Sequence, residues 1–448
     1  MKMKTILIKN AHIVNEGTIQ KGDILIEGDY IKEINDSISA KSADVIVFDA
    51  EGKYVLPGVI DDQVHFREPG LTQKATIQTE SKAAIAGGIT SFIEMPNTNP
   101  QTTTLEELEK KFEIASKTSS ANYSFMFGGT NDNLDEILKV DPKKVAALKL
   151  FLGSSTGNML VDDPKVLENI FSKTKLLIAV HCEDEDTIKA NFETYKEKFG
   201  DDIPMKYHPE IRSAEACYLS SSRAIALAKK TGAKLHVFHL STAIETDLFS
   251  NKIPLKDKNI TAEVCIHHLW FTNKDYDTKG SFIKWNPAVK SENDREALWE
   301  ALLDDRIDVI ATDHAPHTME EKKNVYTKAP SGGPLVQHAL PAMLEMYHKE
   351  KISIEKIVEK MCHNPAILFQ IEKRGFIREG YFADLVVVDL NNPWTVKKEN
   401  ILYKCGWSPF EGTTFKSRIT QTFINGVLVY NNSKFMDVKA AKRLTFNR

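Results

Sequence analysis

The chain has 448 residues, with 58 lysines and arginines against 62 aspartates and glutamates, so its formal net charge is −4. Its 42% hydrophobic and 27% charged residues are typical of a globular protein with a large core and exclude a disordered chain. The slight acidity gives no basic surface for nucleic acid or anionic membranes. Because no apolar run reaches about 18 residues, we also expect no membrane-spanning helix.

The start of the chain, MKMKTILIKNAHIVN, alternates like a strand and lacks the apolar core of a signal peptide. The cysteines are few, odd in number and widely scattered, which is typical of reduced thiols. We therefore expect a cytoplasmic protein. The cysteines are Cys182, Cys217, Cys265, Cys362 and Cys405.

Both ends of the chain read as short strands separated by turns. Residues 1–57 contain ILIKNAHIV and DILIEGDYIKEI, and residues 371–448 contain YFADLVVVDL and ITQTFINGVLVY, with an Asn-Gly hairpin signal. The ends form either two small domains or one composite domain. We favour one composite β-sandwich domain, because each end alone is short for an independent β core.

The middle of the chain, residues 58–370, alternates eight apolar runs with helix-period segments such as LEELEKKFEIASK, PKVLENIFSK and EACYLSSSRAIALAKKTG. Eight strand–helix units favour an α/β fold of the (β/α)8 type, with the site at the C-terminal ends of the strands. A doubly wound sheet is the competing architecture, but no GxGxxG follows the first strand. The runs are GVIDDQVHF, GITSFIEMPN, NYSFMFGGT, VAALKLFLGSS, LLIAVHCED, KLHVFHLST, ITAEVCIHHLWF and DVIATDHAP.

Residues that can bind metal occur at the C-terminal ends of five different runs. Strand ends on one barrel face converge, so these side chains are expected to share one site. Imidazole and carboxylate together suit zinc or a similar divalent metal, and no cysteine lies at ligand spacing. A carboxylate here can also exchange a proton with bound water, and the alternative is an aspartate that only caps a loop. The residues are His65, Lys149, His181, His239 and Asp313.

Two positions leave alternatives open. Gln63 and His65 share one strand face, where a second histidine would give a strong two-ligand signal, but an amide is a weaker ligand than imidazole. Lys149 lies in a strongly apolar strand. Either its amine extends to the barrel mouth, or burial lowers its pKa and the neutral amine captures CO2 as a carbamate that bridges two metals.

Motifs along essentially the whole chain resemble the amidohydrolase superfamily, and within it the longer, type I dihydroorotases. That many motifs in this order are highly specific to the superfamily and fairly specific to the dihydroorotases. The motifs are PGVIDDQVHFREPG (57–70), EMPNTNP (94–100), ALKLFL (147–152), AVHCE (179–183), VFHLS (237–241), EVCIHHLWF (263–271), ATDHAPH (311–317) and SGGPLVQH (331–338).

The resemblance implies a metal centre with one or two Zn2+ ions. His65 and Asp313 would bind the first ion, and a carboxylated Lys149 would bridge it to a second ion held by His181 and His239. The chain departs from the family at Gln63, where a histidine is usual, and this departure should weaken the first metal position.

The resemblance also implies substrate contacts. Arg67 would hold a substrate carboxylate, Asn97 and Asn286 would make further contacts, and His317 and the backbone of SGGPL would support the ring. An arginine can pair with a carboxylate through two charge-assisted hydrogen bonds. Hydantoinases and allantoinases are otherwise similar but lack this arginine.

The implied activity is the reversible interconversion of L-dihydroorotate and N-carbamoyl-L-aspartate in de novo pyrimidine biosynthesis, with Asp313 as proton acceptor and donor. The partner would be a small molecule, and a homo-oligomer is compatible with the sequence. One alternative is another cyclic amidohydrolase of the hydantoinase or allantoinase kind. The other is a non-catalytic scaffold subunit, which Gln63 favours and the retained ligand set disfavours.

Overall fold

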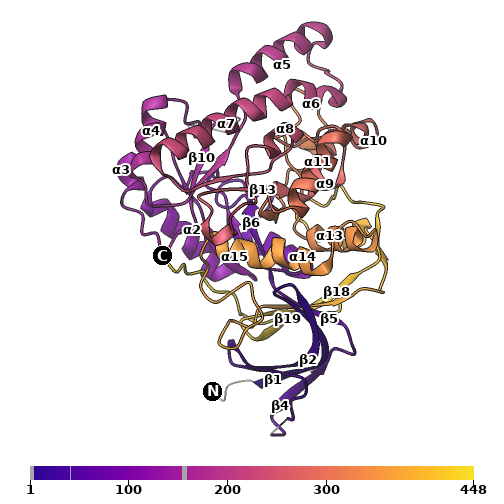
Figure 1. Cartoon of the computed structure of the whole chain (residues 1–448). Coiled ribbons are helices and arrows are strands. Elements are labelled where there is room, and N and C mark those ends of the chain that lie inside the picture. The colour runs from indigo at the N-terminus through magenta and orange to yellow at the C-terminus, as the bar shows by residue number, and fades with distance from the viewer. Residues whose placement is uncertain (1–4, 41, 154–158) are drawn as a thin grey trace.

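The computed structural model describes residues 5–40, 42–153 and 159–448. Figure 1 shows a barrel surrounded by helices, with the first and last strands of the chain side by side beneath it. Every helix within the described ranges is too short or too polar to cross a bilayer.

The barrel consists of parallel strands in two hydrogen-bonded sheets, ordered β6-β7-β8 and β14-β13-β12-β11-β10-β9. β8 continues into β9 after one residue, and a parallel bridge between Val64 and His314 joins the other two edges. The ring therefore closes with eight strand positions, and the predicted (β/α)8 barrel is confirmed. The strands are β6 (Val59–Val64), β7 (Ile89–Glu94), β8 (Asn122–Phe125), β9 (Phe127–Gly128), β10 (Leu148–Phe151), β11 (Ile178–His181), β12 (Leu235–Val237), β13 (Ile260–Cys265) and β14 (Val309–Ala311).

Helices follow the barrel strands and cover their outer face. Each of the three helix-period segments singled out in the sequence forms a helix, and each begins at a side-chain cap: Thr104, Asp163 and Ser213 accept backbone N–H bonds. The main helices are α1 (Ile77–Ala86), α2 (Leu105–Thr118), α4 (Pro164–Lys173), α5 (Glu185–Phe199), α7 (Ala214–Thr231), α11 (Glu292–Leu303) and α13 (Ala339–His348). Shorter helices are α3 (Leu134–Ile137), α6 (His208–Ile211), α8 (Ala243–Thr246), α9 (Ile266–Trp270), α10 (Tyr276–Lys279), α12 (Met319–Lys322), α14 (Ile354–Val358) and α15 (Asn364–Leu368).

A nine-stranded sheet contains strands from both chain ends, in the order β20-β19-β18-β15-β5-β1-β2-β3, with β4 paired to β1. β5 joins the two ends, because it pairs in parallel with β1 and antiparallel with β15. The strands are β1 (Thr5–Asn15), β2 (Thr18–Glu27), β3 (Tyr30–Asn35), β4 (Val45–Asp49), β5 (Tyr54–Pro57), β15 (Leu385–Asp389), β18 (Arg418–Ile424), β19 (Val427–Asn431) and β20 (Lys434–Phe435).

The predicted hairpin at FINGV forms the turn between β18 and β19. Asn425 and Gly426 both have positive φ, 48° and 73°, as a tight two-residue hairpin turn requires. The domain boundaries at 57/58 and 370/371 stay a prediction.

Parts of the last 78 residues pack on the barrel rather than on the sheet. The segment 390–417, with β16 (Trp394–Thr395) and β17 (Thr414–Phe415), lies over the side near His317, and the Trp407 indole N–H donates to the His317 carbonyl at 2.8 Å. At the opposite end of the barrel, Leu444 and Phe446 pack in one apolar cluster with Ile60. The C-terminal region therefore supports both ends of the barrel.

Candidate active site

A cavity of about 280 Å³ opens at the C-terminal ends of the barrel strands. All the candidate residues singled out in the sequence line it, together with Gln63. Barrel closure brings them together from strands and loops separated by up to about 250 residues. The lining includes Gln63, His65, Arg67, Asn97, Lys149, His181, His239, Asn286, Asp313, His317, Ser331 and Gly332.

His65 and Asp313 form one close pair in this cavity. His65 Nε2 lies 3.1 Å from Asp313 Oδ1, and His65 Nδ1 lies 2.8 Å from Asn97 Oδ1. Because the amide oxygen can only accept, Nδ1 carries the proton and Nε2 presents a lone pair to the carboxylate. Burial also lowers the pKa of His65, which favours the neutral ring. Two electron-pair donors therefore face one another.

His181 and His239 form a second pair, with His181 Nδ1 at 2.9 Å from His239 Nε2. The other nitrogen of His181 donates to Glu183 at 2.9 Å, which leaves Nδ1 as an acceptor. Burial alone would raise the pKa of Glu183, but Arg212 and His181 lower it to about 2, so this carboxylate is charged. Glu183 thus fixes the tautomer of His181, as carboxylates do behind metal-binding histidines.

Lys149 lies on β10 and is 1% exposed. Its Nζ sits 4.1 Å from the ring centre of Phe238 and 4.7 Å from that of Phe151. Burial lowers the pKa of Lys149 to about 7, although Asp313 and Glu263 oppose this change. Much of the amine is therefore neutral and nucleophilic at physiological pH.

Gln63 is buried and lines the cavity, but its amide oxygen already has a partner. The Cys265 thiol donates to Gln63 Oε1 at 3.3 Å. The amide therefore connects the ends of β6 and β13 at the cavity floor.

Arg67 is a buried cation in the cavity wall, 8% exposed. Its Nε donates to the Pro316 carbonyl at 3.1 Å, and no carboxylate in the described ranges forms an ion pair with it. Burial lowers the pKa of Arg67 only to about 10, so the guanidinium stays charged at neutral pH. A buried charge without a counter-ion is costly, and an anionic ligand would remove that cost.

His317 is held next to Arg67 in one orientation. Lys74 Nζ lies 3.0 Å from His317 Nδ1, and His317 Nε2 lies 3.0 Å from the Ser331 carbonyl. Since the ammonium can only donate, Nδ1 accepts from Lys74, while Nε2 lies between the Ser331 carbonyl and Arg67 Nη2, which is 3.1 Å away. Burial, with Arg67 and Lys74 nearby, holds the pKa of His317 well below its usual range, so the ring is neutral.

Three non-glycine residues of the site adopt the left-handed backbone region. The φ angles of Arg67, His239 and Asp313 are 67°, 40° and 48°. Such conformations are uncommon outside glycine and cluster at functional sites, where the surrounding structure holds them. They turn these side chains away from the regular direction of a strand.

Sequence reasoning missed two residues that organise the site. Glu183 lies two residues after His181, a spacing that places both side chains on one face of an extended chain. That signal was available in AVHCE. Lys74 lies in the loop before α1, and no spacing or periodicity in the sequence connects it to His317.

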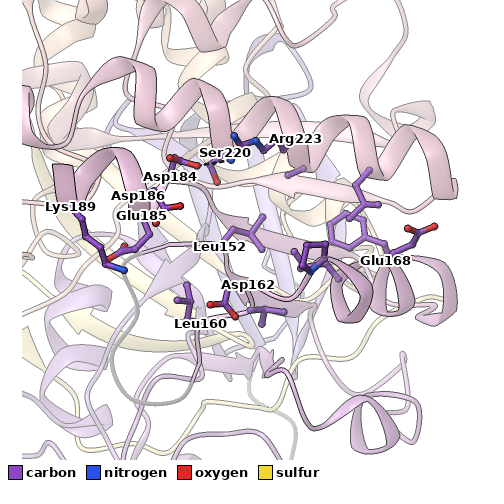
Figure 2. Close-up of a pocket in the computed structure, with 16 residues that line it drawn as sticks. Leu152, Leu160, Asp162, Glu168, Asp184, Glu185, Asp186, Lys189, Ser220 and Arg223 are labelled. Carbon is purple, nitrogen blue, oxygen red and sulfur yellow. Dashed lines mark hydrogen bonds and ion pairs between the residues drawn. The ribbon is translucent and has the colours of Figure 1, made fainter. Parts of the chain in front are cut away.

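A larger cavity, of about 580 Å³, lies between α4, α7 and the start of α5 (Figure 2). Its polar lining is mostly acidic, and Arg223 pairs with Asp184 at 2.6 Å. None of its described lining residues is a histidine. The candidate metal ligands therefore line the smaller cavity and not this one.

The chain is similar to known proteins over most of its length. The model of the amidohydrolase family matches residues 54–429. The chain is 35% identical over 437 residues to the dihydroorotase of Carboxydothermus hydrogenoformans, covering 95% of this chain and 97% of that one. It is 34% identical over 435 residues to the dihydroorotase of Staphylococcus epidermidis, covering 96% of this chain and 100% of the relative.

Two solved structures share the fold. The L-hydantoinase (dihydropyrimidinase) of Arthrobacter aurescens superposes with a TM-score of 0.93 at 28% identity, covering 98% of this chain and 99% of that one. A D-hydantoinase (dihydropyrimidinase) of Thermus sp. gives a TM-score of 0.87 at 26% identity, covering 98% of both chains. The barrel with an additional β domain is therefore shared across these proteins.

Proposed function

The chain belongs to the amidohydrolase family, and from this premise we propose that it is a dihydroorotase. The reaction is the reversible hydrolysis of the ring amide of L-dihydroorotate to N-carbamoyl-L-aspartate. Both compounds carry a carboxylate on the carbon bonded to N1, whereas the bond that breaks or forms joins N3 to C4.

The observation that carries the proposal is the position of Arg67. It is a buried guanidinium that lines the cavity and forms no ion pair with a described carboxylate. A substrate carboxylate would supply the missing anion and accept two parallel hydrogen bonds. Hydantoin and dihydrouracil have the cyclic amide but no carboxylate, so they would leave Arg67 uncompensated.

The donor set of the cavity fits a divalent metal. His65 Nε2 lies 3.1 Å from Asp313 Oδ1, and the proton of the His65 ring is on the other nitrogen. His181 Nδ1 lies 2.9 Å from His239 Nε2. Imidazole and carboxylate are ligands that zinc prefers, and Glu183 and Asn97 orient the two rings from behind. We infer that these two pairs hold one or two Zn2+ ions.

Lys149 completes the proposed metal site. Its buried, largely neutral amine can attack CO2 to form a carbamate, with release of one proton. The carbamate would carry a negative charge where the ammonium carries a positive one. Such an anion could act as a ligand between two metal ions. The rings of Phe238 and Phe151 pack against the amine.

When bound, the metal would polarise the ring carbonyl and lower the pKa of a bound water. Side chains of the protein would bind and orient the substrate and transfer the proton. Arg67 binds the carboxylate, and Asn97 and Asn286 contact the ring from the cavity wall. Asp313 accepts a proton from the attacking water and delivers it to the ring nitrogen as the C–N bond breaks. His317, held by Lys74 and Ser331, keeps the ring in line with Asp313.

The test is an assay of the zinc-loaded chain on L-dihydroorotate, hydantoin and allantoin. We expect turnover of dihydroorotate and its loss in Asp313→Ala, by about 10²–10⁴-fold. The control is Asp135→Ala, an exposed aspartate on α3, which should retain wild-type activity. Turnover of hydantoin or allantoin without dihydroorotate would refute the proposal.

Two other functions make different predictions. A hydantoinase-like enzyme is supported by the fold similarity to the L-hydantoinase, but it gives Arg67 no anion to bind. A non-catalytic scaffold is supported by Gln63, and it predicts less than about 0.2 metal ions per chain in this cavity after purification with zinc. Metal analysis beside the substrate assay separates all three.

A further inference from the structure

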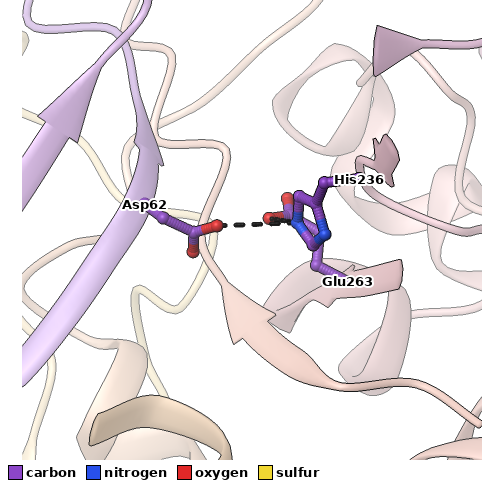
Figure 3. Close-up of side chains that lie close together, drawn as sticks. All are labelled: Asp62, His236 and Glu263. Carbon is purple, nitrogen blue, oxygen red and sulfur yellow. Dashed lines mark hydrogen bonds and ion pairs between the residues drawn. The ribbon is translucent and has the colours of Figure 1, made fainter. Parts of the chain in front are cut away.

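Three fully buried side chains from three strands meet below the candidate active site (Figure 3). They are Asp62 on β6, His236 on β12 and Glu263 on β13. His236 Nε2 lies 3.1 Å from Glu263 Oε2 and 3.6 Å from Asp62 Oδ2. Because β6 pairs with neither β12 nor β13, the side chains meet across the barrel interior. None of the three lines the cavity described above.

Asp62 points into this group without a hydrogen-bond donor. Both of its carboxylate oxygens are buried, and neither has a hydrogen-bond partner among the described residues. Figure 3 shows the Asp62 carboxylate directed at the His236 ring. A buried carboxylate with neither oxygen hydrogen-bonded is rare in folded proteins, and it indicates that something else neutralises the charge.

The proton of His236 points away from the carboxylates. The Thr261 hydroxyl donates its single proton to the Leu235 carbonyl at 3.3 Å, so it accepts from His236 Nδ1 at 2.9 Å. His236 Nε2 therefore presents a lone pair to Glu263 and Asp62. Three electron-pair donors converge on one point, and a histidine held from behind through its other nitrogen is typical of metal ligands.

No side chain of the group supplies a positive charge. Burial lowers the pKa of His236 to about 4, so the ring is neutral, and burial raises the pKa of Glu263 to about 8. Burial and the nearby Glu263 also raise the pKa of Asp62 well above its usual range. These directions mean that each carboxyl group favours its protonated form unless a cation lies close to it, and the Lys149 amine only partly opposes this for Glu263.

We propose that Asp62, His236 and Glu263 bind a divalent cation of the zinc or manganese class, at a structural site separate from the candidate active site. The ligand atoms all lie within 4.8 Å of one another. Ligands about 2.1 Å from a common ion lie about 3.0–3.5 Å apart, close to the two distances measured from His236 Nε2. Two carboxylates and one divalent ion also sum to zero charge, which suits a buried position.

The closed position of the site implies that the ion binds as the chain folds. All three side chains are 0% exposed, and they connect β6 to β12 and β13, with which β6 does not pair. The ion would therefore hold β6 against β12 and β13 and contribute to folding stability rather than to turnover. Chelators should remove it more slowly than ions in the open cavity.

The decisive experiment is anomalous scattering from crystals of the wild-type chain prepared with zinc, and in parallel with manganese. We expect a peak at the metal edge between Asp62, His236 and Glu263. Metal analysis of Asp62→Asn should show about one ion fewer per chain than wild type, with a lower melting temperature. The matched control is Asp23→Asn, a buried aspartate of the nine-stranded sheet, which should keep the wild-type metal content.

The competing explanation is a proton shared by Asp62 and Glu263. In that case the map has no peak at this position, and Asp62→Asn keeps both its metal content and its melting temperature, because the asparagine amide can donate to Glu263. Either of those results overturns the proposal. If Asp62→Asn does not fold, the wild-type map alone decides.

Discussion

The substitution Arg67→Gln tests carboxylate recognition directly. Arg67 Nε donates to the Pro316 carbonyl and Nη2 lies 3.1 Å from His317 Nε2, which leaves both Nη1 hydrogens and the second Nη2 hydrogen for a ligand. Glutamine keeps a polar end but carries no charge and cannot donate through a two-pronged fork. The variant therefore removes the proposed ion pair and the contact of Arg67 Nη2 with His317, while Lys74 and Ser331 still hold the His317 ring.

The size of the effect follows from the contacts that are lost. A hydrogen bond to a charged group contributes about 1.5–3 kcal/mol, so two such bonds contribute about 3–6 kcal/mol. Each 1.36 kcal/mol corresponds to about a tenfold change in rate, which predicts a fall of about 10²–10⁴-fold in kcat/KM for dihydroorotate. Arg67→Lys keeps the charge but not the fork, so its loss should be intermediate.

The assay compares dihydroorotate with 5,6-dihydrouracil, the same ring without the carboxylate. Arg67→Gln should lower kcat/KM for dihydroorotate alone and should leave the metal content unchanged. Arg223→Gln, which alters an arginine of the larger cavity, is the control and should change neither substrate. An equal loss on both rings, or a loss of metal, would refute the reasoning, because Arg67 would then shape the cavity rather than bind the anion.

Three further predictions concern the metal, the composite sheet and a buried lysine. Lys149→Met should lose bound zinc and activity together, measured by metal analysis; full zinc content would exclude Lys149 as a ligand. Leu385→Ala, at a fully buried position of β15, should lower the free energy of unfolding by about 2–5 kcal/mol in urea titrations; a change under about 1 kcal/mol would mean that β15 contributes little to the core. Burial lowers the pKa of Lys284 to about 7, from an ordinary value of 10.5. Between these values the unfolded chain binds a proton that the folded chain lacks, so stability rises with pH across this window. Lys284→Met should flatten that rise in denaturation curves, and an unchanged slope would assign it to other groups.

Local patterns predicted most of the barrel because its strands are buried on both faces and read as continuous apolar runs. The turn at Asn425 and Gly426 was also predictable, since its dipeptide has few alternatives. The path of segment 390–417 could not be predicted from local patterns. Trp407 contacts His317 across 90 residues, and no periodicity in the sequence encodes a contact of that kind.

The candidate ligands were predictable for a geometric reason. His181 ends β11 and Asp313 follows β14 by two residues, and a closed barrel brings such ends together whatever their sequence separation. Residues that act through another side chain were harder to identify. Lys74 reaches the site through its contact with His317, and an isolated lysine in a loop is ordinarily a solvated surface residue.

The run Asp61-Asp62-Gln63 shows why alternation fails at the centre of the site. Strict alternation would direct Asp61 and Gln63 to one face of β6 and Asp62 to the other. The register of β6 against β7 shifts between Asp61 and Val64, and such a bulge redirects side chains. Asp61 accepts from the Thr312 hydroxyl at 2.7 Å, and the thiol of Cys265 reaches Gln63.

Asp62 is left facing His236 and Glu263 in the barrel interior. The positions of the Gln63 and Asp62 side chains therefore both depend on one local distortion of β6. A histidine at position 63 would add an imidazole at the cavity floor, but it would also displace the amide that accepts the Cys265 thiol. It would leave the charge of Asp62 as it is, because that charge depends on the group across the barrel and not on its neighbour in the chain.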